Sequence, residues 1–158
     1  FVAGLWPDAE AAGVSRATFE AAFRGLTPDP KVLAQTRRQG EFTRSLADYV
    51  EGAVSAGRLR RGRELAERWA PVLDRLEREH GVPRTILLAL WGIESEFGRG
   101  TGGFDVVRSL ATLAAAGYRA DLFRRELIAA LVILERERLP RASLTGSWAG
   151  AMGQTQFM

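Results

Sequence analysis

Apolar residues recur at helical spacing along nearly the whole chain, and no segment alternates convincingly between apolar and polar residues. Helix boundary signals punctuate the pattern. Ser15 and Ser55 stand where N-caps belong, and Gly81 stands where a helix stops. Strands joined into a sheet leave a period-two signal that is absent here. The sequence therefore predicts an all-α fold.

The spacing and the boundary signals also divide the chain into expected helices. These are a short helix opened by Pro7, helices capped by Ser15 and Thr43, a long charged helix from Ser55 to about His80, an apolar helix over 83–97, a short helix over 105–115 and a helix from Asp121 to about Arg138. Gly25, Pro28 and Pro30 predict a turn. Pro71 should kink or divide the charged helix. We expect the other helices to pack around the 83–97 helix, and we expect a loop with one helical turn after Pro140.

Length and composition limit the class of protein. A chain of 158 residues is long enough to bury the core of one domain. No apolar run reaches membrane-spanning length, because charges interrupt each candidate. The absence of cysteine excludes disulfides and thiolate metal ligands. The chain begins at Phe1 without a signal peptide, so we expect that an upstream segment precedes it.

The basic residues are almost all arginine, with Lys31 the sole lysine and a net charge of +3. Arginine pairs bidentately with carboxylates and phosphates, so this composition fits an anionic polymer such as nucleic acid or an acidic cell wall. The alternative, which we favour, is a genomic preference for arginine codons on a solvated helical surface. A nucleic-acid-binding domain would need a basic, acid-free recognition helix, and every arginine-rich segment here also carries acids.

One carboxylate stands out in the most apolar expected helix. On a helical wheel, Leu87, Leu90, Trp91 and Phe97 all fall within about 60° of Glu94. We therefore expect Glu94 to lie in the middle of a core-facing stripe. Removal of a carboxyl group from water raises its pKa, which allows such a group to act as a general acid near neutral pH. The alternative is a buried Glu that pairs with an Arg.

The other acids do not suggest a second catalytic carboxylate. Glu96 falls on the far side of the same helix and is expected to be a surface acid or an ion-pair partner of Arg99. Glu126, Glu135 and Glu137 share a helix with several arginines, which is typical of a solvated, ion-paired face.

Two motifs resemble the lytic murein transglycosylase B family, whose members cleave peptidoglycan glycan strands. The family pattern GVPxxIxxAxxGxESxFGxxxGxF matches GVPRTILLALWGIESEFGRGTGGF at 81–104, and GSWAGAMGxxQFM matches GSWAGAMGQTQFM at 146–158. SLATLA at 109–114, YRADLFRREL at 118–127 and several stretches upstream, QGEF among them, are also similar to the family, in the same order. The resemblance covers nearly the whole chain and implies a lysozyme-like catalytic α domain.

The resemblance also implies site residues. By it Glu94 is the catalytic acid and base, Ser147 and Gln156 line the sugar-binding cleft, and Tyr49 and Arg119 contact sugar and peptide stem. Structural alternatives remain open: Ser147 as a cap in a glycine-rich loop, Gln156 as a side chain that satisfies backbone groups, and Tyr49 as a packing residue. Neither a cofactor nor a metal is implied.

The implied reaction uses one Glu twice. It protonates the oxygen between MurNAc and GlcNAc, then accepts the proton of the MurNAc C6 hydroxyl as that oxygen attacks C1. The product is a 1,6-anhydro ring, and the expected partner is the peptidoglycan glycan strand, not nucleic acid. The alternative function is a peptidoglycan-binding module of the same fold that does not cleave.

The family pattern also sets expectations about the whole molecule. We expect residues 1–158 to form one catalytic domain, with an N-terminal helical part to about residue 80, a catalytic-helix core from about 81, and a C-terminal remainder absent after Met158. The implied location is the periplasm, and an outer-membrane anchor on a segment before Phe1 is left open as an alternative to a soluble periplasmic form.

Overall fold

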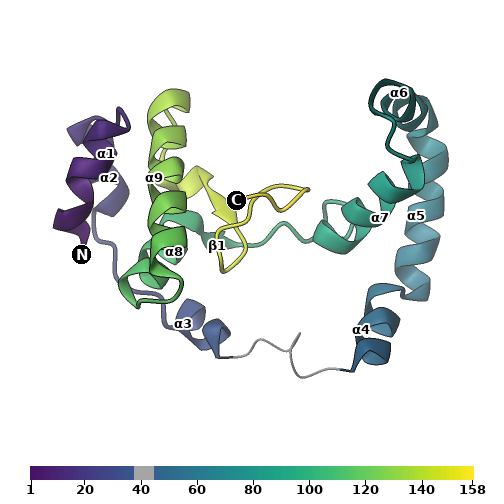
Figure 1. Ribbon diagram of the computed structural model, residues 1–158, viewed down its shortest axis with the longest axis horizontal. Helices are drawn as coiled ribbons and strands as arrows, with labels where there is room; N and C mark the ends of the chain where they lie inside the picture. Colours follow the sequence, from purple (N-terminus) through teal and green to yellow (C-terminus); the bar gives the residue numbers. More distant parts are fainter. Residues whose placement is uncertain (38–44) are drawn as a thin grey trace. The chain divides into compact units, whose positions relative to one another are not determined.

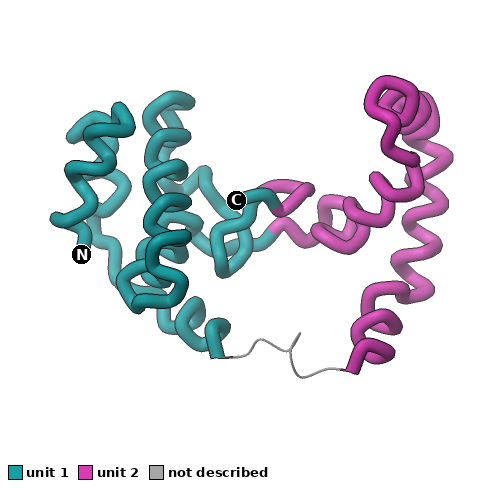
Figure 2. Tube along the Cα trace, in the orientation of Figure 1, with its two compact units in different colours: residues 1–38, 102–152, 157–158 teal, residues 39–101, 153–156 magenta. Residues whose placement is uncertain are grey.

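A computed structural model describes residues 1–37 and 45–158 (Figure 1). The chain separates into two units (Figure 2). Unit 1 takes its described residues from 1–38, 102–152 and 157–158, and unit 2 takes them from 39–101 and 153–156. Each unit is therefore assembled from stretches that are distant in the sequence.

Unit 1 is a helical cluster whose centre is α8. Its elements are η1 (Val2–Leu5), α1 (Trp6–Ala11), α2 (Arg16–Phe23), α3 (Pro30–Thr36), β1 (Phe104–Asp105), α8 (Val106–Ala115), α9 (Ala120–Glu137), η3 (Arg141–Ser143) and β2 (Thr145–Gly146). Helices α8 and α9 pack side by side, with α1 and α2 against α9 and α3 against α8 (Figure 1). Most of α8 is buried, including the fully buried Val106, Val107 and Leu113. Burial on nearly all sides explains why α8 consists mainly of apolar and small residues.

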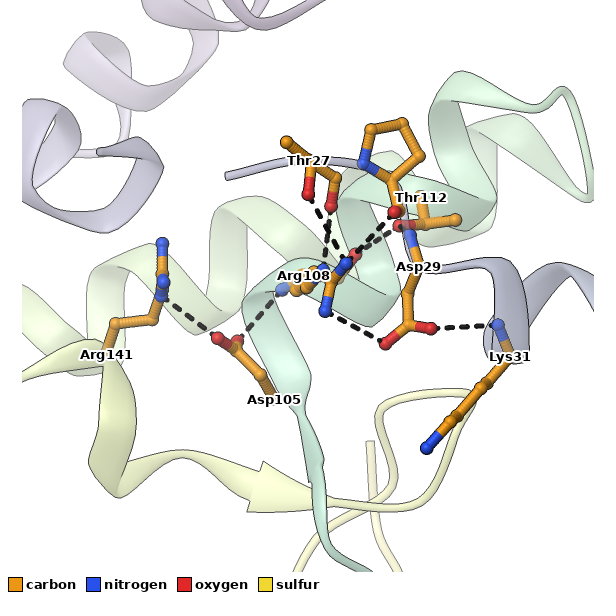
Figure 3. Close-up of polar contacts among 8 residues, drawn as sticks. Thr27, Asp29, Lys31, Asp105, Arg108, Thr112 and Arg141 are labelled. Carbon is orange, nitrogen blue, oxygen red and sulfur yellow. Dashed lines mark hydrogen bonds and ion pairs between the residues drawn. The ribbon is translucent and has the colours of Figure 1, made fainter. Parts of the chain in front are cut away.

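A polar network fixes the segment before α3 to the start of α8 (Figure 3). The guanidinium of Arg108 donates to the backbone oxygens of Thr27 (2.7 Å) and Pro28 (3.0 Å) and lies 3.3 Å from the Asp29 carboxylate. Asp105 caps α8 by accepting from the backbone N–H of Arg108 at 3.0 Å, and its other oxygen pairs with Arg141 at 3.0 Å. The Arg108 side chain thus satisfies two loop carbonyls that have no helical partner.

Unit 1 also contains one short two-stranded sheet, formed by β1 and β2. Strands β1 and β2 are antiparallel, with Phe104 opposite Gly146 and Asp105 opposite Thr145. A Cβ on Gly146 would lie 2.3 Å from the carbonyl oxygen of Ala151, closer than such atoms come in real structures. The glycine is therefore required by the close approach of the backbone.

Unit 2 contains α4 (Leu46–Ala53), α5 (Ala56–Arg68), α6 (Ala70–His80) and α7 (Arg84–Ser95). Helices α5, α6 and α7 contact one another. The N-caps Ser45 and Ser55 accept hydrogen bonds from Asp48 and Arg58 in the first turns of α4 and α5. Left-handed Gly81 ends α6.

Most of the sequence-based helices are confirmed, and three expectations are corrected. The all-α class is confirmed, as are the Ser15 and Ser55 caps and the division near Pro71, where Trp69 separates α5 from α6. Helix α3 was predicted as a turn, and β1 and β2 were not predicted. The core of unit 1 is built on α8 and α9, so a fold packed around the 83–97 helix is wrong.

Thr43 and the QGEF stretch lie outside the described residues. The helix that was expected to follow a Thr43 cap begins at Leu46, and Ser45 is its N-cap. The expectation of one catalytic domain over 1–158 stays a prediction; the two units do not follow its division near residue 80, because each unit draws on both sides of that boundary.

Candidate functional site

Glu94 lies in the last turn of α7, and its side chain is exposed. Neighbouring apolar residues on α7 are exposed too: Ile86 by 50%, Leu90 by 53% and Ile93 by 47%. The expectation of a core-facing stripe around Glu94 is therefore wrong, although the surrounding surface is apolar as predicted. No side chain or backbone group among the described residues pairs with the Glu94 carboxylate, so the alternative of a buried Glu–Arg pair is wrong as well.

The buried residues of α7 are Gly92 and Ser95, and the end of the helix departs from regular geometry. Glu96 and Phe97 both adopt left-handed backbone conformations, with φ of 51° and 57°. This turn folds the Phe97 ring back over Gly92, where it packs at 8% exposure. A regular helical wheel places Phe97 beside Glu94, so the wheel misassigned the buried face. Two consecutive non-glycine residues with positive φ are uncommon and are typical of functional sites.

Ser95, next to Glu94, ties the end of α7 to the Gly153–Gln156 turn of unit 2. Its hydroxyl is buried, donates to the backbone oxygen of Gln154 at 2.6 Å and accepts from the N–H of Gly98 at 3.1 Å. The indole N–H of Trp91 donates to the side-chain oxygen of Gln154, also at 2.6 Å. Two bonds from one helical turn therefore fix Gln154 beside the segment that carries Glu94.

Gln156 belongs to the same turn and is itself anchored to backbone. Its side-chain nitrogen donates to the carbonyl oxygens of Gly153 (2.8 Å) and Thr101 (3.2 Å). This observation supports the backbone-satisfying alternative for the amide nitrogen. The amide oxygen has no donor in the described part of the chain and is available to accept a hydrogen bond from a ligand.

Glu96 has an ion-pair partner other than the one that the sequence suggested. Its carboxylate pairs with Arg58 near the start of α5, not with Arg99. The pair joins α5 to the residue that immediately follows α7. Glu96 therefore has an ion-pair partner, whereas Glu94 has none among the described residues.

Ser147 lies in unit 1 and organises the loop after β2. Its hydroxyl oxygen accepts from the backbone N–H groups of Ala149 (3.3 Å) and Ala151 (3.0 Å). The cap-like alternative therefore describes its contacts within the chain. The hydroxyl proton is free to donate to a ligand, because both observed bonds use the oxygen as acceptor.

The two remaining candidates are exposed. Tyr49 lies on α4 in unit 2 at 49% exposure, so the packing alternative is not supported. Arg119 is the left-handed N-cap residue of α9 in unit 1, with φ of 43°. Glu94, Gln156 and Tyr49 thus share unit 2, whereas Ser147 and Arg119 belong to unit 1. Sequence reasoning missed Gln154, because its bonds to Ser95 and Trp91 join residues about 60 positions apart and leave no local signal.

Among the described residues, no group of three or more His, Asp or Glu side chains is arranged to hold a metal ion. None of the helices in residues 1–37 and 45–158 has both the length and the apolar character needed to span a membrane.

The chain has relatives among known proteins. The model of the transglycosylase SLT domain family matches residues 1–158. The chain belongs to this family. Among curated proteins, membrane-bound lytic murein transglycosylase B of Escherichia coli K12 is 32% identical over 112 residues, which are 70% of this chain and 31% of that protein.

Solved structures of the family share the fold. SltB3 of Pseudomonas aeruginosa, solved in complex with NAG-NAM-pentapeptide, matches with a TM-score of 0.90 and 41% identity over 99% of this chain and 42% of that one. SltB1 of the same organism, a soluble lytic transglycosylase, matches with a TM-score of 0.89 and 34% identity over 99% of this chain and 54% of that one. The lysozyme-like α fold is thereby confirmed. The chain spans about a third to a half of the length of these relatives.

Proposed function

We propose that this chain carries the catalytic Glu of a lytic transglycosylase that cleaves the β-1,4 bond between MurNAc and GlcNAc in peptidoglycan. The observation that carries the proposal is the unpaired, exposed Glu94 on an apolar surface in a chain of the SLT family. The P. aeruginosa relative was solved with a NAG-NAM-pentapeptide, which supports a glycan strand with peptide stems as the ligand here.

In the proposed reaction Glu94 acts first as an acid and then as a base. The protonated carboxyl group donates its proton to the glycosidic oxygen as the C1–O bond breaks. The N-acetyl group of the substrate stabilises positive charge at C1. The carboxylate then takes the proton of the C6 hydroxyl while O6 bonds to C1, which gives 1,6-anhydro-MurNAc and returns Glu94 to its protonated form. Water is not consumed.

The other predicted residues have supporting roles in this proposal. The free amide oxygen of Gln156 and the hydroxyl proton of Ser147 supply hydrogen bonds to sugar. Tyr49 and Arg119, both exposed, contact sugar and peptide stem. We place the activity in the periplasm, where peptidoglycan lies, in keeping with the membrane-bound E. coli relative.

The test is mass analysis of purified peptidoglycan digested by the natural protein that contains this chain. Anhydro-muropeptides support the proposal. Reducing ends would indicate a lysozyme-type hydrolase, and an unchanged sacculus that still binds the protein would indicate a non-cleaving module. Gln156→Ala and Ser147→Ala should each slow cleavage without changing the product, because each removes a hydrogen bond worth about 1 kcal/mol.

A further inference from the structure

A cavity of about 420 Å³ in unit 2 is lined largely by charged side chains. Four arginines and two glutamates form its charged lining: Arg58, Arg60, Arg61, Arg99, Glu64 and Glu96. Four positive charges and two negative ones leave a net charge of +2 inside one small volume. Glu94 does not line this cavity, so the cavity is distinct from the candidate catalytic carboxylate.

Some of the arginines that line the cavity have ion-pair or hydrogen-bond partners, and others have none among the described residues. Arg58 donates to the backbone oxygen of Ala53 and pairs with Glu96, and Arg61 lies 3.6 Å from Glu64. Arg60 and Arg99 have neither an ion pair nor a hydrogen bond among the described residues. Both side chains are exposed, so their guanidinium groups are accessible to an anion from solution.

The donors that an anion in the cavity could reach are the terminal guanidinium N–H groups. The Nε atoms of Arg58 and Arg61 are buried and without a hydrogen-bond partner in the described part of the chain, so they do not face the open space. An oxyanion supplies several acceptor oxygens at once. Guanidinium groups suit this ligand because their forked N–H groups match the oxygens of a carboxylate or a phosphate.

We propose that this arginine cavity is a binding site for an oxyanion, either a peptide carboxylate or a phosphate. The proposal goes beyond the function proposed above, because it does not require that the chain cleave a glycan. Arg60 and Arg99 supply the free charge, and the ion pair between Arg58 and Glu96 fixes another part of the cavity lining.

The experiment is isothermal titration calorimetry of the chain at low ionic strength with three probes. The probes are inorganic phosphate, acetyl-alanyl-glutamate with two free carboxylates, and the diamide of the same dipeptide. The test variant is Arg60→Gln with Arg99→Gln. The matched control is Arg75→Gln with Arg78→Gln, which removes the same charge from exposed positions of α6 outside the cavity.

We expect saturable binding of phosphate or of the acidic dipeptide, no binding of the diamide, and affinity about tenfold weaker in the test variant only. Binding of the dipeptide identifies a carboxylate as the ligand group, and binding of phosphate alone identifies a phosphate. Equal weakening by both double variants would reduce the effect to long-range charge and overturn the site. Absence of saturable binding to the wild-type chain would overturn it too. Thermal melting of both variants checks that the fold is retained.

Discussion

The hydroxyl of Ser95 and the carbonyl oxygen of Gln154, 59 residues apart in the sequence, are joined by a 2.6 Å hydrogen bond. Ser95 directly follows Glu94, and Gln154 lies in the turn that contains Gln156. The bond therefore couples the end of the proposed catalytic helix to the turn that carries a proposed sugar ligand. Because Ser95 is only 2% exposed, water cannot easily replace its hydroxyl.

Ser95→Ala should lower both stability and cleavage. Its loss removes the bond to Gln154 and leaves the N–H of Gly98 without its acceptor, at a cost of about 1–3 kcal/mol. Thermal melting and a digestion assay measure the two effects. Ser143→Ala, at an exposed position of η3, is the control and should change neither. A Ser95→Ala protein with wild-type melting temperature and activity would show that the bond does not organise the site.

Glu94→Gln should abolish cleavage and leave the melting temperature unchanged, because the carboxylate has no partner in the described structure to lose. Glu96→Gln on the same turn loses its ion pair with Arg58 and should cost at most about 1 kcal/mol, while cleavage persists. The two variants are compared by muropeptide analysis and calorimetric melting. Loss of cleavage in Glu96→Gln with retention in Glu94→Gln would reverse the assignment.

Gly92→Ala should destabilise unit 2, because its Cβ would lie 2.7 Å from the Phe97 ring. Overpacking of this kind costs about 1–3 kcal/mol, more than the gain of up to about 1 kcal/mol from replacing glycine in a helix. In a Phe97→Leu background the ring is gone, so the same substitution should become neutral or stabilising. Urea unfolding of the four proteins in this cycle measures the coupling, and additive effects would refute a direct Gly92–Phe97 contact.

Ser109→Ala should stabilise unit 1. The Ser109 hydroxyl is buried in α8 and has no hydrogen-bond partner among the described residues. Its removal relieves an unfavourable desolvation, for an expected gain of about 1 kcal/mol in the free energy of unfolding. The same Ser143→Ala protein is the reference in chemical denaturation. A destabilised Ser109→Ala protein would instead reveal an internal water bound to the hydroxyl.

The hydrogen bonds from Ser15, the N-cap of α2, to the Glu135 carboxylate should make the stability of the protein depend on pH. Hydrogen bonds from the Thr18 and Ser15 side chains, and from the backbone of Ser15, hold the pKa of the Glu135 carboxyl below its usual value of 4.5. A pKa lowered by folding gives stabilisation that is fully present above the unfolded-state pKa and is lost as the pH falls through the folded-state pKa. The advantage of wild type over Glu135→Gln in melting temperature should therefore shrink below pH 4.5. Glu137→Gln, at an exposed position, should show no such trend, and a gap that stays constant with pH would contradict the prediction.

The sequence predicted those helices whose ends carry local chemical signals. Ser15 and Ser55 accept first-turn N–H groups as expected, and Gly81 adopts the left-handed conformation that ends α6. Helix α3 was missed because Pro28 and Pro30 were interpreted as a turn. Pro30 in fact occupies the first turn of α3, after the Asp29 cap, where proline is well tolerated. Strands of two residues leave no period to detect.

The candidate site was predicted from family resemblance rather than from the helical wheel. The wheel correctly placed Glu94 on an apolar face but could not show whether that face is covered, because coverage depends on contacts distant in the sequence. It also assumed regular geometry to Phe97, whereas the left-handed turn at Glu96 redirects that ring toward Gly92. The pairing of Glu96 with Arg58 and the bond from Ser95 to Gln154 are likewise long-range relations without a local signature.

Unit 1 is built mainly from two stretches of chain separated by most of unit 2, and this order has a consequence for folding during synthesis on the ribosome. Helices α1 to α3 bury their apolar faces against α8 and α9, yet the whole of residues 39–101 is synthesised in between. The first helices therefore emerge without their partners and must wait for the second half of the chain, which closes a long loop at an entropic cost. Folding of unit 1 is thus a late, non-local event, and α5 to α7 are free to assemble before it.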